Sequence, residues 1–305
     1  MNRYEFELLK YLEKHGPTVY CARTFSDVLN ISGSALNAAL EVAEENAWVD
    51  RNEDKVSISE KGLEALEPYR VQRAVIFAAG FGSRMVPVTL DTPKPLVNVN
   101  GKRIIDRLLD ALLAIGIEDI TLVRGYKKEC FDILLEKYPN LNLVDNDIYN
   151  ETNNISSALA VLEKLDQCYI CEADLLVANP EIIEKYQYVS NYLGSYSMET
   201  DDWCFDMVDG KVCNYRKGGN YCYNAYGISY WTKEDSGKLR ADLKECFEKE
   251  GGKDIFWEFV PLVELTDCYH VEVRPCKKTD ITEIDNFYEL VEIDPTYRDY
   301  PGQEA

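Results

Sequence analysis

The stretch "FAAGFGSRMVPVTLDTPKPL", residues 77–96, contains two closely spaced glycines, an arginine, and a lysine held between two prolines. Gly80 and Gly82 allow a tight turn whose backbone N–H groups can approach a ligand closely. Arg84 offers a forked cationic donor to a bound anion, and Lys94 adds a second positive charge. The GxxxxGK[ST] pattern and the third glycine of the dinucleotide fingerprint are both absent from this stretch. It therefore predicts a phosphate-binding loop of another type, placed at the end of a strand.

From Ala74 onward, strand-like apolar runs alternate with amphipathic helical segments. "AVIFAAG", "DITLVRG" and "CYICEAD" are predicted strands, and "RIIDRLLDALLAIG" and "NISSALAVLEKL" are predicted helices. This alternation with short loops favours an α/β domain over residues 71–305, with a mostly parallel nucleotide-binding sheet and helices on both faces. Ligands bind such a sheet beyond the carboxyl ends of its strands, where residues 77–96 and Asp174 are expected to lie.

Composition limits the classes of function. The chain has 305 residues, 46% of them hydrophobic, with a formal net charge of −21 and two histidines. The negative charge disfavours non-specific binding to nucleic acid and to anionic membranes. No run of about 18 apolar residues is present, so we expect no membrane insertion and a cytoplasmic location. The scarcity of histidine leaves little scope for chemistry that needs a histidine base.

Residues 1–70 have a different pattern from the rest of the chain. Their order of helix, helix, helix, hairpin and helix, with the phrases "LNISGSALNAALEVAEENAWVDR" and "KVSISEKGLEAL", resembles the winged-helix domain of MarR-type regulators of transcription. That resemblance implies DNA binding. However, the expected recognition helix, residues 32–46, has no lysine or arginine, and residues 1–70 carry eight basic against thirteen acidic residues, a net of −5. DNA binding is therefore disfavoured, and a protein-interaction or dimerisation module is the preferred interpretation.

Residues 74–112, "AVIFAAGFGSRMVPVTLDTPKPLVNVNGKRIIDRLLDAL", resemble the signature of the nucleoside triphosphate transferases almost from end to end. Farther along, "NNISSAL", "CEAD", "GISYW", "IFWEFV" and "TEIDNFYEL" occur in the order and spacing of the bacterial phosphocholine cytidylyltransferases. This similarity extends from about Arg73 to Pro295. Met85 and Val86 depart from the more usual Leu-Arg pair of the signature, and this change leaves the phosphate contacts intact.

The resemblance implies transfer of a nucleotidyl group, in which a phosphate of the acceptor attacks the α-phosphorus of CTP and expels pyrophosphate. Arg84 would bind the β and γ phosphates, and Lys94 the α phosphate. Because the attacking phosphate is already ionised near neutral pH, no general base is needed, and the protein supplies positioning and charge. The triphosphate and the edge of the base would be held by the backbone of Ala78, Ala79, Gly80, Phe81, Gly82 and Ser83.

The same resemblance implies a magnesium site. Asp174 and Asp285 match the family's metal-binding acids, and two carboxylates with phosphate oxygens suit Mg²⁺. Asp285 also precedes the helical segment "NFYELVEI", so a helix cap is the competing role. Asn153 and Asn154 are expected near the base or ribose, with capping as the alternative for Asn154.

The acceptor site is expected among aromatic residues, because a quaternary ammonium is bound by aromatic faces and nearby carboxylates. Trp203 lies in the stretch that matches the family's acceptor site and is the first choice. Tyr226, Trp257 and Glu258 are further candidates. The alternative is that these aromatic side chains belong to the core.

The sequence thus favours a magnesium-dependent cytidylyltransferase that makes CDP-choline from CTP and phosphocholine. The same chemistry on 2-aminoethylphosphonate or a sugar 1-phosphate remains an alternative, and so does a winged-helix regulator that uses the transferase domain as a ligand sensor. The oligomeric state is open, and a homodimer is compatible with the sequence.

Overall fold

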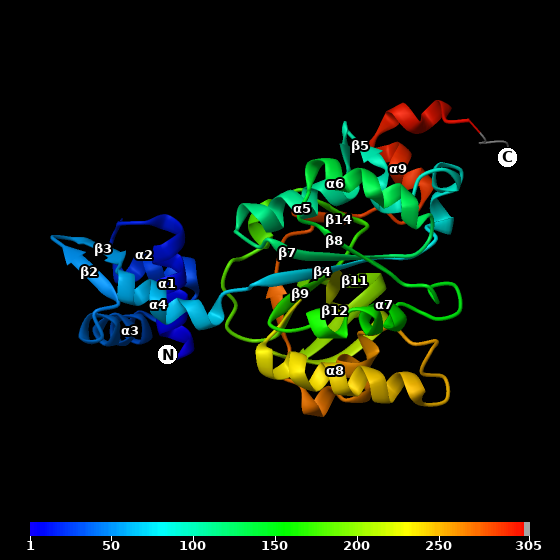
Figure 1. Ribbon diagram of the computed structural model, residues 1–305. Coiled ribbons are helices and arrows are strands. Elements are labelled where there is room, and N and C mark those ends of the chain that lie inside the picture. The colour runs from blue at the N-terminus through cyan, green and yellow to red at the C-terminus, as the bar shows by residue number, and fades with distance from the viewer. Residues whose placement is uncertain (302–305) are drawn as a thin grey trace. The chain divides into compact units, whose positions relative to one another are not determined.

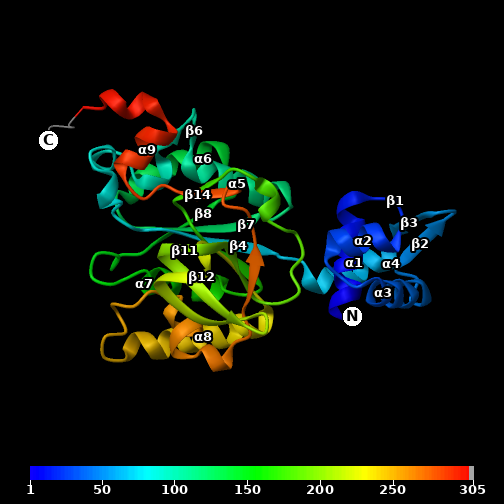
Figure 2. The same ribbon diagram turned by 180° about the vertical axis from the view of Figure 1, so that it is seen from behind.

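The computed structural model describes residues 1–301, which form two compact units. The first unit comprises Met1–Arg70 and Tyr186–Tyr188, and the second comprises Val71–Lys185 and the described residues from Val189 onward. Figures 1 and 2 show the elements of both units from opposite sides.

The first unit is mainly helical. Within the described residues 1–70 its three strands pair in the order β1-β3-β2. A strand at Thr18–Val19, which we had not predicted, pairs antiparallel with β3. The remaining elements follow the expected order. The elements are α1 (Arg3–His15), β1 (Thr18–Val19), α2 (Ala22–Leu29), α3 (Gly33–Glu45), β2 (Val49–Asn52), β3 (Lys55–Ile58) and α4 (Glu60–Leu66).

A segment distant in the sequence completes this unit. The Tyr188 ring stacks on Tyr69 at 5.5 Å and lies 5.3 Å from the Phe6 ring. Tyr186 is 2% exposed and forms a β-bridge with Arg70. The predicted second domain, residues 71–305, is therefore not continuous in the structure, since residues 186–188 pack with the first unit.

The second unit is built on a mixed sheet with the order β11-β13-β12-β9-β4-β7-β8 among the described residues. Strands β9, β4, β7 and β8 run parallel, and β12 joins β9 in the antiparallel direction. The long hairpin of β11 and β12 forms the other side of the sheet together with β13. The bounds are β4 (Arg73–Ala78), β7 (Asp119–Arg124), β8 (Asn142–Asp145), β9 (Cys168–Glu172), β11 (Asn191–Val208), β12 (Lys211–Trp231) and β13 (Glu272–Pro275).

Helices cover both faces of this sheet, as predicted (Figure 1). α5 (Ile104–Ala114) and α6 (Leu134–Lys137) lie on one face, and α7 (Ile155–Ala160) and α8 (Lys233–Glu248) on the other. Alternate residues of β4 enter different cores because successive side chains of a strand point to opposite faces. Ile76 packs with the core under α5, and Val75 and Phe77 pack with the core under α7 and α8.

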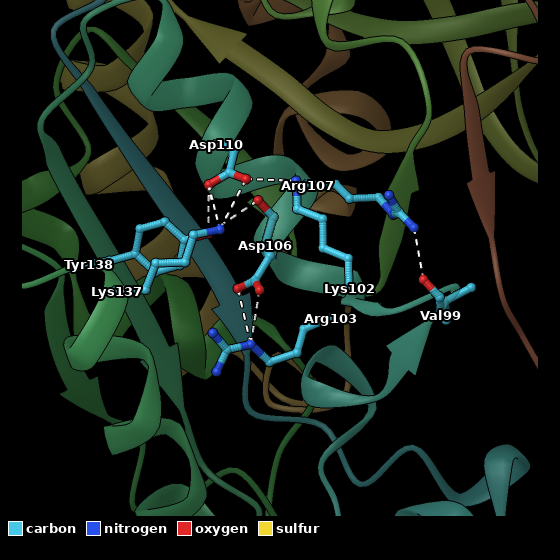
Figure 3. Close-up of polar contacts among 8 residues, drawn as sticks. All are labelled: Val99, Lys102, Arg103, Asp106, Arg107, Asp110, Lys137 and Tyr138. Atoms are coloured by element: carbon cyan, nitrogen blue, oxygen red, sulfur yellow. Dashed lines mark hydrogen bonds and ion pairs between the residues drawn. The ribbon is translucent and has the colours of Figure 1, made fainter.

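Charged side chains fasten α5 to its surroundings (Figure 3). Asp110 forms ion pairs with Lys102 at 2.6 Å and with Lys137 at 3.0 Å. It also accepts a hydrogen bond from the Tyr138 hydroxyl at 2.7 Å. These contacts tie the middle of α5 to β6 (Lys102–Arg103) and to the end of α6. β6 itself pairs with β5 (Asn98–Val99).

The last described segment packs against residues 85–88. β14 (Ile281–Glu283) pairs antiparallel with β10 (Leu175–Val177), and α9 (Phe287–Ile293) follows. Phe287 and Leu290 share a buried apolar cluster with Met85 and Val88. This packing brings residues 283–285 to the cleft described below. None of the helices among residues 1–301 combines the length and the apolar character needed to cross a membrane.

Candidate active site

A cleft of about 330 Å³ opens at the carboxyl ends of the parallel strands. It collects side chains from the segments that follow β4, β8 and β9, together with α7 and Asp285. The predicted residues that line it are Ala78, Ala79, Gly80, Gly82, Ser83, Arg84, Lys94, Asn153, Asn154, Asp174 and Asp285. Phe81 is not among the lining residues.

The glycine-containing loop after β4, residues 79–83, is folded back onto the segment that carries Lys94. Gly82 has φ +62°, and a Cβ there would lie 3.1 Å from the Cβ atom of Lys94 and from a methyl carbon of Thr89. The Thr89 hydroxyl donates to the Gly82 carbonyl at 2.9 Å. Glycine at this position thus satisfies both the left-handed backbone and the close approach. Phe81, between the two glycines, packs its ring at 5.3 Å from that of Tyr149.

Lys94 is the buried cation of the cleft. Its ammonium is 2.7 Å from the Asp174 carboxylate, and the residue is 7% exposed. Burial alone would disfavour the charged form, but the carboxylates of Asp174, Glu283 and Asp285 outweigh burial and raise the pKa of Lys94. The side chain is therefore a fixed positive charge at neutral pH.

Three carboxyl groups converge beside this lysine. Oxygen atoms of Glu172, Asp174 and Glu283 all lie within 4.8 Å of one another. Burial raises the pKa of Glu283 to about 8, and the neighbouring Asp174 and Asp285 add to that rise. Burial also raises the pKa of Glu172. The Oδ1 atom of Asp174 is buried without a hydrogen-bond partner among the described residues. A group of hard oxygen donors with an unsatisfied carboxylate oxygen fits a divalent cation.

This group contains one residue of the predicted metal pair, Asp174. Asp285, the second predicted ligand, lines the same cleft and forms an ion pair with Arg84 at 2.7 Å. We did not predict a role for Glu172 or Glu283. Each lies two residues before a predicted ligand, in "CEAD" and "TEID", and the two-residue period of a strand places such pairs on one face. This two-residue spacing is the sequence feature from which Glu172 and Glu283 could have been predicted to lie at the site.

Asn153 and Asn154 use their side chains within the protein. Asn154 accepts a hydrogen bond from the Trp257 backbone N–H at 2.9 Å and donates to Glu258 at 3.4 Å. The Asn153 amide donates to the Asp254 carbonyl at 3.1 Å. Asn154 occupies the N-cap position of α7 without a side-chain capping bond. Both side chains tie the start of α7 to the segment at 254–258.

Trp203 belongs to an aromatic cluster with Tyr215, Phe256 and Phe259. It stacks on Tyr215 at 4.9 Å and meets Phe256 and Phe259 edge-on, each at 5.6 Å. The Trp203 side chain is partly exposed. Burial raises the pKa of Tyr215, and the carboxyl groups of Glu258 and Glu172 raise it further. None of the four rings is among the residues that line the cleft.

The other predicted acceptor contacts have different surroundings. Trp257 is 1% exposed and packs edge-on against Trp231 at 5.7 Å, so the structure makes it a core side chain rather than a ligand contact. Glu258 is also buried; burial raises its pKa to about 7, and it accepts a hydrogen bond from Tyr192 at 3.3 Å. The Tyr226 hydroxyl lies 3.1 Å from that of Ser195.

The family of this chain follows from its similarity to known proteins. The model of the MobA-like NTP transferase domain matches residues 74–189. The chain is 38% identical to the 2-aminoethylphosphonate cytidylyltransferase of Lancefieldella rimae over 228 residues, which cover 73% of this chain and 92% of that protein. It is 30% identical to the choline-phosphate cytidylyltransferase of Streptococcus pneumoniae, over 72% of this chain and 97% of that one.

A solved structure agrees with these sequence matches. The CTP:phosphocholine cytidylyltransferase from Streptococcus pneumoniae superposes with a TM-score of 0.68 at 30% identity, over 74% of this chain and 99% of that chain. The α/β fold is thus that of the nucleotidyltransferases. The chain belongs to the NTP transferase family, in its group of cytidylyltransferases.

Proposed function

We propose that the protein transfers the CMP group of CTP to phosphocholine. The observation that supports this choice of acceptor is the aromatic cluster of Trp203, Tyr215, Phe256 and Phe259. A trimethylammonium group has no N–H to donate and is stabilised by aromatic faces and by negative potential. Trp203 and Tyr215 stack in this cluster, and the exposed carboxyl groups of Asp201 and Asp202 directly precede Trp203 in the chain.

The reaction is an exchange of bonds at phosphorus. An oxygen of the phosphocholine phosphate forms a bond to the α-phosphorus of CTP, and the bond from that phosphorus to the bridging oxygen of pyrophosphate breaks. The attacking oxygen carries no proton that must be removed near neutral pH. The described residues that line the cleft accordingly include cations and amides but no histidine.

The cations of this chain have separate tasks in that exchange. Lys94 is buried and fixed by Asp174, so it can neutralise charge that develops at the α phosphate without reorganising. Arg84 is more exposed and is held by Asp285, which keeps its guanidinium in place for the β and γ phosphates. The backbone of residues 78–83 would supply N–H donors to the remaining phosphate oxygens.

Asp174 and Asp285 would hold Mg²⁺, with Glu172 and Glu283 as further carboxyl groups beside Asp174. The convergence of Glu172, Asp174 and Glu283 and the unsatisfied Oδ1 atom of Asp174 support this part of the proposal. When bound, Mg²⁺ supplies charge neutralisation for phosphate oxygens.

The specific observation that favours a second acceptor, 2-aminoethylphosphonate, is the 38% identity to an enzyme named for that compound. Its primary ammonium would be bound by hydrogen bonds to carboxylates rather than by aromatic faces alone. Asp202, which is exposed and adjoins Trp203, is available for such a contact.

For the first unit we propose a winged-helix module that serves protein interaction or dimerisation rather than DNA binding. The exposed side chains of α3 include Glu41, Glu44 and Glu45. Arg51, in the hairpin, is 2.7 Å from Glu44, so this cation is paired with the protein's own helix. A helix with that charge does not supply the phosphate contacts that DNA binding requires.

The test is pyrophosphate release by the purified protein with Mg²⁺, across CTP, UTP, ATP and dTTP and across phosphocholine, 2-aminoethylphosphonate and glucose 1-phosphate. We expect the highest kcat/KM with CTP and phosphocholine. A higher value with 2-aminoethylphosphonate would select the second acceptor. Nucleotide binding without turnover on any acceptor would contradict the enzyme proposal and favour a ligand sensor.

A further inference from the structure

Part of strand β11 forms an open edge of the sheet. Residues 195–200 pair with residues 219–224 of β12 on one side. On the other side β13 pairs with β11 only as far as Gly194, and no strand within residues 1–301 takes its place beyond that residue. An unpaired strand edge is a template for another strand, because its N–H and C=O groups are left without partners.

The direction of the backbone shows which groups face this edge. The Gly194 carbonyl points to it, since that oxygen accepts the Cys276 backbone N–H at 2.9 Å. Backbone polar groups alternate between the two sides of a strand, so those of Tyr196, Met198 and Thr200 point the same way as the Gly194 carbonyl. The edge thus offers the N–H and C=O groups of these residues to a further strand.

Exposed apolar side chains accompany the edge. Tyr196 is 53% exposed and Met198 67%. Tyr221, which lies across from Met198 in the register of β11 and β12, is 71% exposed. Proteins commonly shield an open edge with charged side chains, proline or a covering segment. An edge that instead presents apolar side chains is suited to pairing with another chain.

A cation and an anion lie on the other face of the same edge. The ammonium of Lys278 contacts the Ser197 hydroxyl at 3.2 Å and forms no ion pair within the described residues. Glu199 is exposed, and it too has no cationic partner among residues 1–301. Ser197 and Glu199 point to one face of the strand and Met198 to the opposite face, because successive side chains alternate. The edge therefore carries one unpaired charge of each sign.

The backbone of this edge is complementary to itself. In an antiparallel pair of two copies centred on Met198, the N–H and C=O groups of the two Met198 residues face each other. Those of Tyr196 face those of Thr200 in the second copy. All of these groups point to the open edge, so the pairing leaves none of them without a partner. Such an arrangement has twofold symmetry and closes on itself.

The charges select this register among the neighbouring ones. When Met198 is at the centre, Ser197 lies opposite Glu199 of the second copy, and that carboxylate meets Lys278. The twofold axis forms this ion pair twice. Moving the centre by one residue would place Glu199 opposite either its own copy or Ser195, away from Lys278.

We propose that the protein forms a twofold homodimer in which residues 195–200 of β11 pair antiparallel with the same residues of a second copy. Met198 lies at the axis, and Lys278 pairs with Glu199 of the second copy. This inference goes beyond the proposed function and does not rest on it. The segment contributes far fewer than the roughly 20–30 residues per side of a standard interface, so we expect a Kd on the order of 10 µM.

The experiment is sedimentation velocity of the full chain from about 1 to 200 µM, in about 0.15 M salt because the net charge of −21 opposes association at low ionic strength. Wild type should pass from monomer to dimer over this range. Met198→Glu places two carboxylates face to face at the axis and should raise the Kd about tenfold or more.

Val208→Glu is the matched control, because Val208 is a 60% exposed side chain of β11 outside the edge segment. Its Kd should stay within about twofold of wild type, since a surface substitution away from the contact changes little. Thermal melting of each variant shows that the fold is retained.

Charge reversal tests the register. Glu199→Lys and Lys278→Glu should each raise the Kd by about three- to tenfold, since each turns two attractive pairs into repulsive ones. The double variant Glu199→Lys/Lys278→Glu restores opposite charges across the axis, and its Kd should return close to that of wild type. Additive losses in the double variant would overturn the register.

Amide hydrogen exchange tests the strand pairing itself. The N–H groups of Tyr196 and Met198 should exchange more slowly at the high end of the concentration range than at the low end, because only the dimer gives them acceptors. This dependence on concentration should disappear in Met198→Glu. A dimer that leaves these N–H groups unprotected would overturn the strand pairing.

Three further results would overturn the proposal. A wild-type chain that stays monomeric over the whole range would remove the dimer, and a dimer unaffected by Met198→Glu would place the interface elsewhere, such as in the first unit. Growth of ever larger assemblies would indicate an open contact rather than a closed twofold pair. None of the substituted residues lines the cleft, so pyrophosphate release by wild type tests the proposed function separately.

Discussion

Lys94 is the residue on which the proposed chemistry depends most. Lys94→Ala removes the charge fixed 2.7 Å from Asp174 and leaves three half-buried carboxyl groups without that cation. We expect kcat to fall by about 10²–10³-fold, the range seen when a preorganised charge at the transition state is deleted. The measurement is single-turnover pyrophosphate release.

Lys137→Ala is the control for that variant, because Lys137 also pairs with an aspartate, Asp110, but lies outside the cleft (Figure 3). Its turnover should match wild type. If Lys94→Ala turned over at the wild-type rate, the role assigned to this lysine would be wrong.

Substitution of Trp203 should change KM for the acceptor and leave KM for the nucleotide unchanged. Trp203→Ala removes the ring that stacks on Tyr215 and meets Phe256 and Phe259. Loss of a cation–π face costs about 0.5–2 kcal/mol, so KM for phosphocholine should rise by about 2–30-fold while KM for CTP stays constant. Trp203→Phe keeps an aromatic face and should raise KM for phosphocholine less than Trp203→Ala does. A rise confined to KM for CTP would move Trp203 out of the acceptor site.

At the scale of elements, the turn after β7 packs closely against the start of the glycine-containing loop after β4. A Cβ at Gly125 would lie 2.6 Å from the Cγ atom of Tyr149 and 2.9 Å from the carbonyl oxygen of Ala79. Gly125→Ala must therefore displace the Tyr149 ring or the loop. We expect the free energy of unfolding to fall by about 1–3 kcal/mol, which lowers the melting temperature, and we expect KM for CTP to rise. Both are measured by thermal melting and steady-state kinetics.

Gly237→Ala is the matched control within α8. No heavy atom lies within 4 Å of a Cβ built at Gly237, and the position is helical. Alanine there should stabilise the protein by roughly 0.5–1 kcal/mol. Equal effects of the two substitutions would contradict a specific clash at Gly125.

Local pattern was enough to predict β4, α5 and β7, since each is a continuous segment whose period of apolar residues matches its structure. It did not predict β1, which has two residues and pairs only when β3 is in place. Nor did it predict the hydrogen bond between Asn146 and Ser157, because the two side chains meet only when β8 and α7 are folded together.

At the scale of the whole molecule, the first unit depends on residues far along the chain. Tyr186 is 2% exposed within the core of that unit. Tyr186→Ala should destabilise residues 1–70 by about 3–5 kcal/mol, as for other truncations of a large buried side chain. Hydrogen exchange should therefore accelerate in α1 and α3 but not in β4 and β7.

Tyr288→Ala is the control for this change, because Tyr288 is 82% exposed. It should leave exchange in both units as in wild type. Unchanged protection of α1 and α3 in Tyr186→Ala would show that the first unit does not need residues 186–188.

The sequence by itself determined the α/β architecture, and it predicted that the glycine turn, Arg84, Lys94 and Asp174 would meet, as they do in one cleft. These features depend on local spacing and on residue types whose chemistry is independent of distant partners. The tertiary structure alone decided that Asp285 pairs with Arg84, 201 residues away, and that Glu283 joins Glu172 and Asp174. It also placed Trp257 in the core and residues 186–188 in the first unit. Such contacts are set by how folded segments pack, and no spacing along the chain encodes the distance between two side chains that only folding brings together.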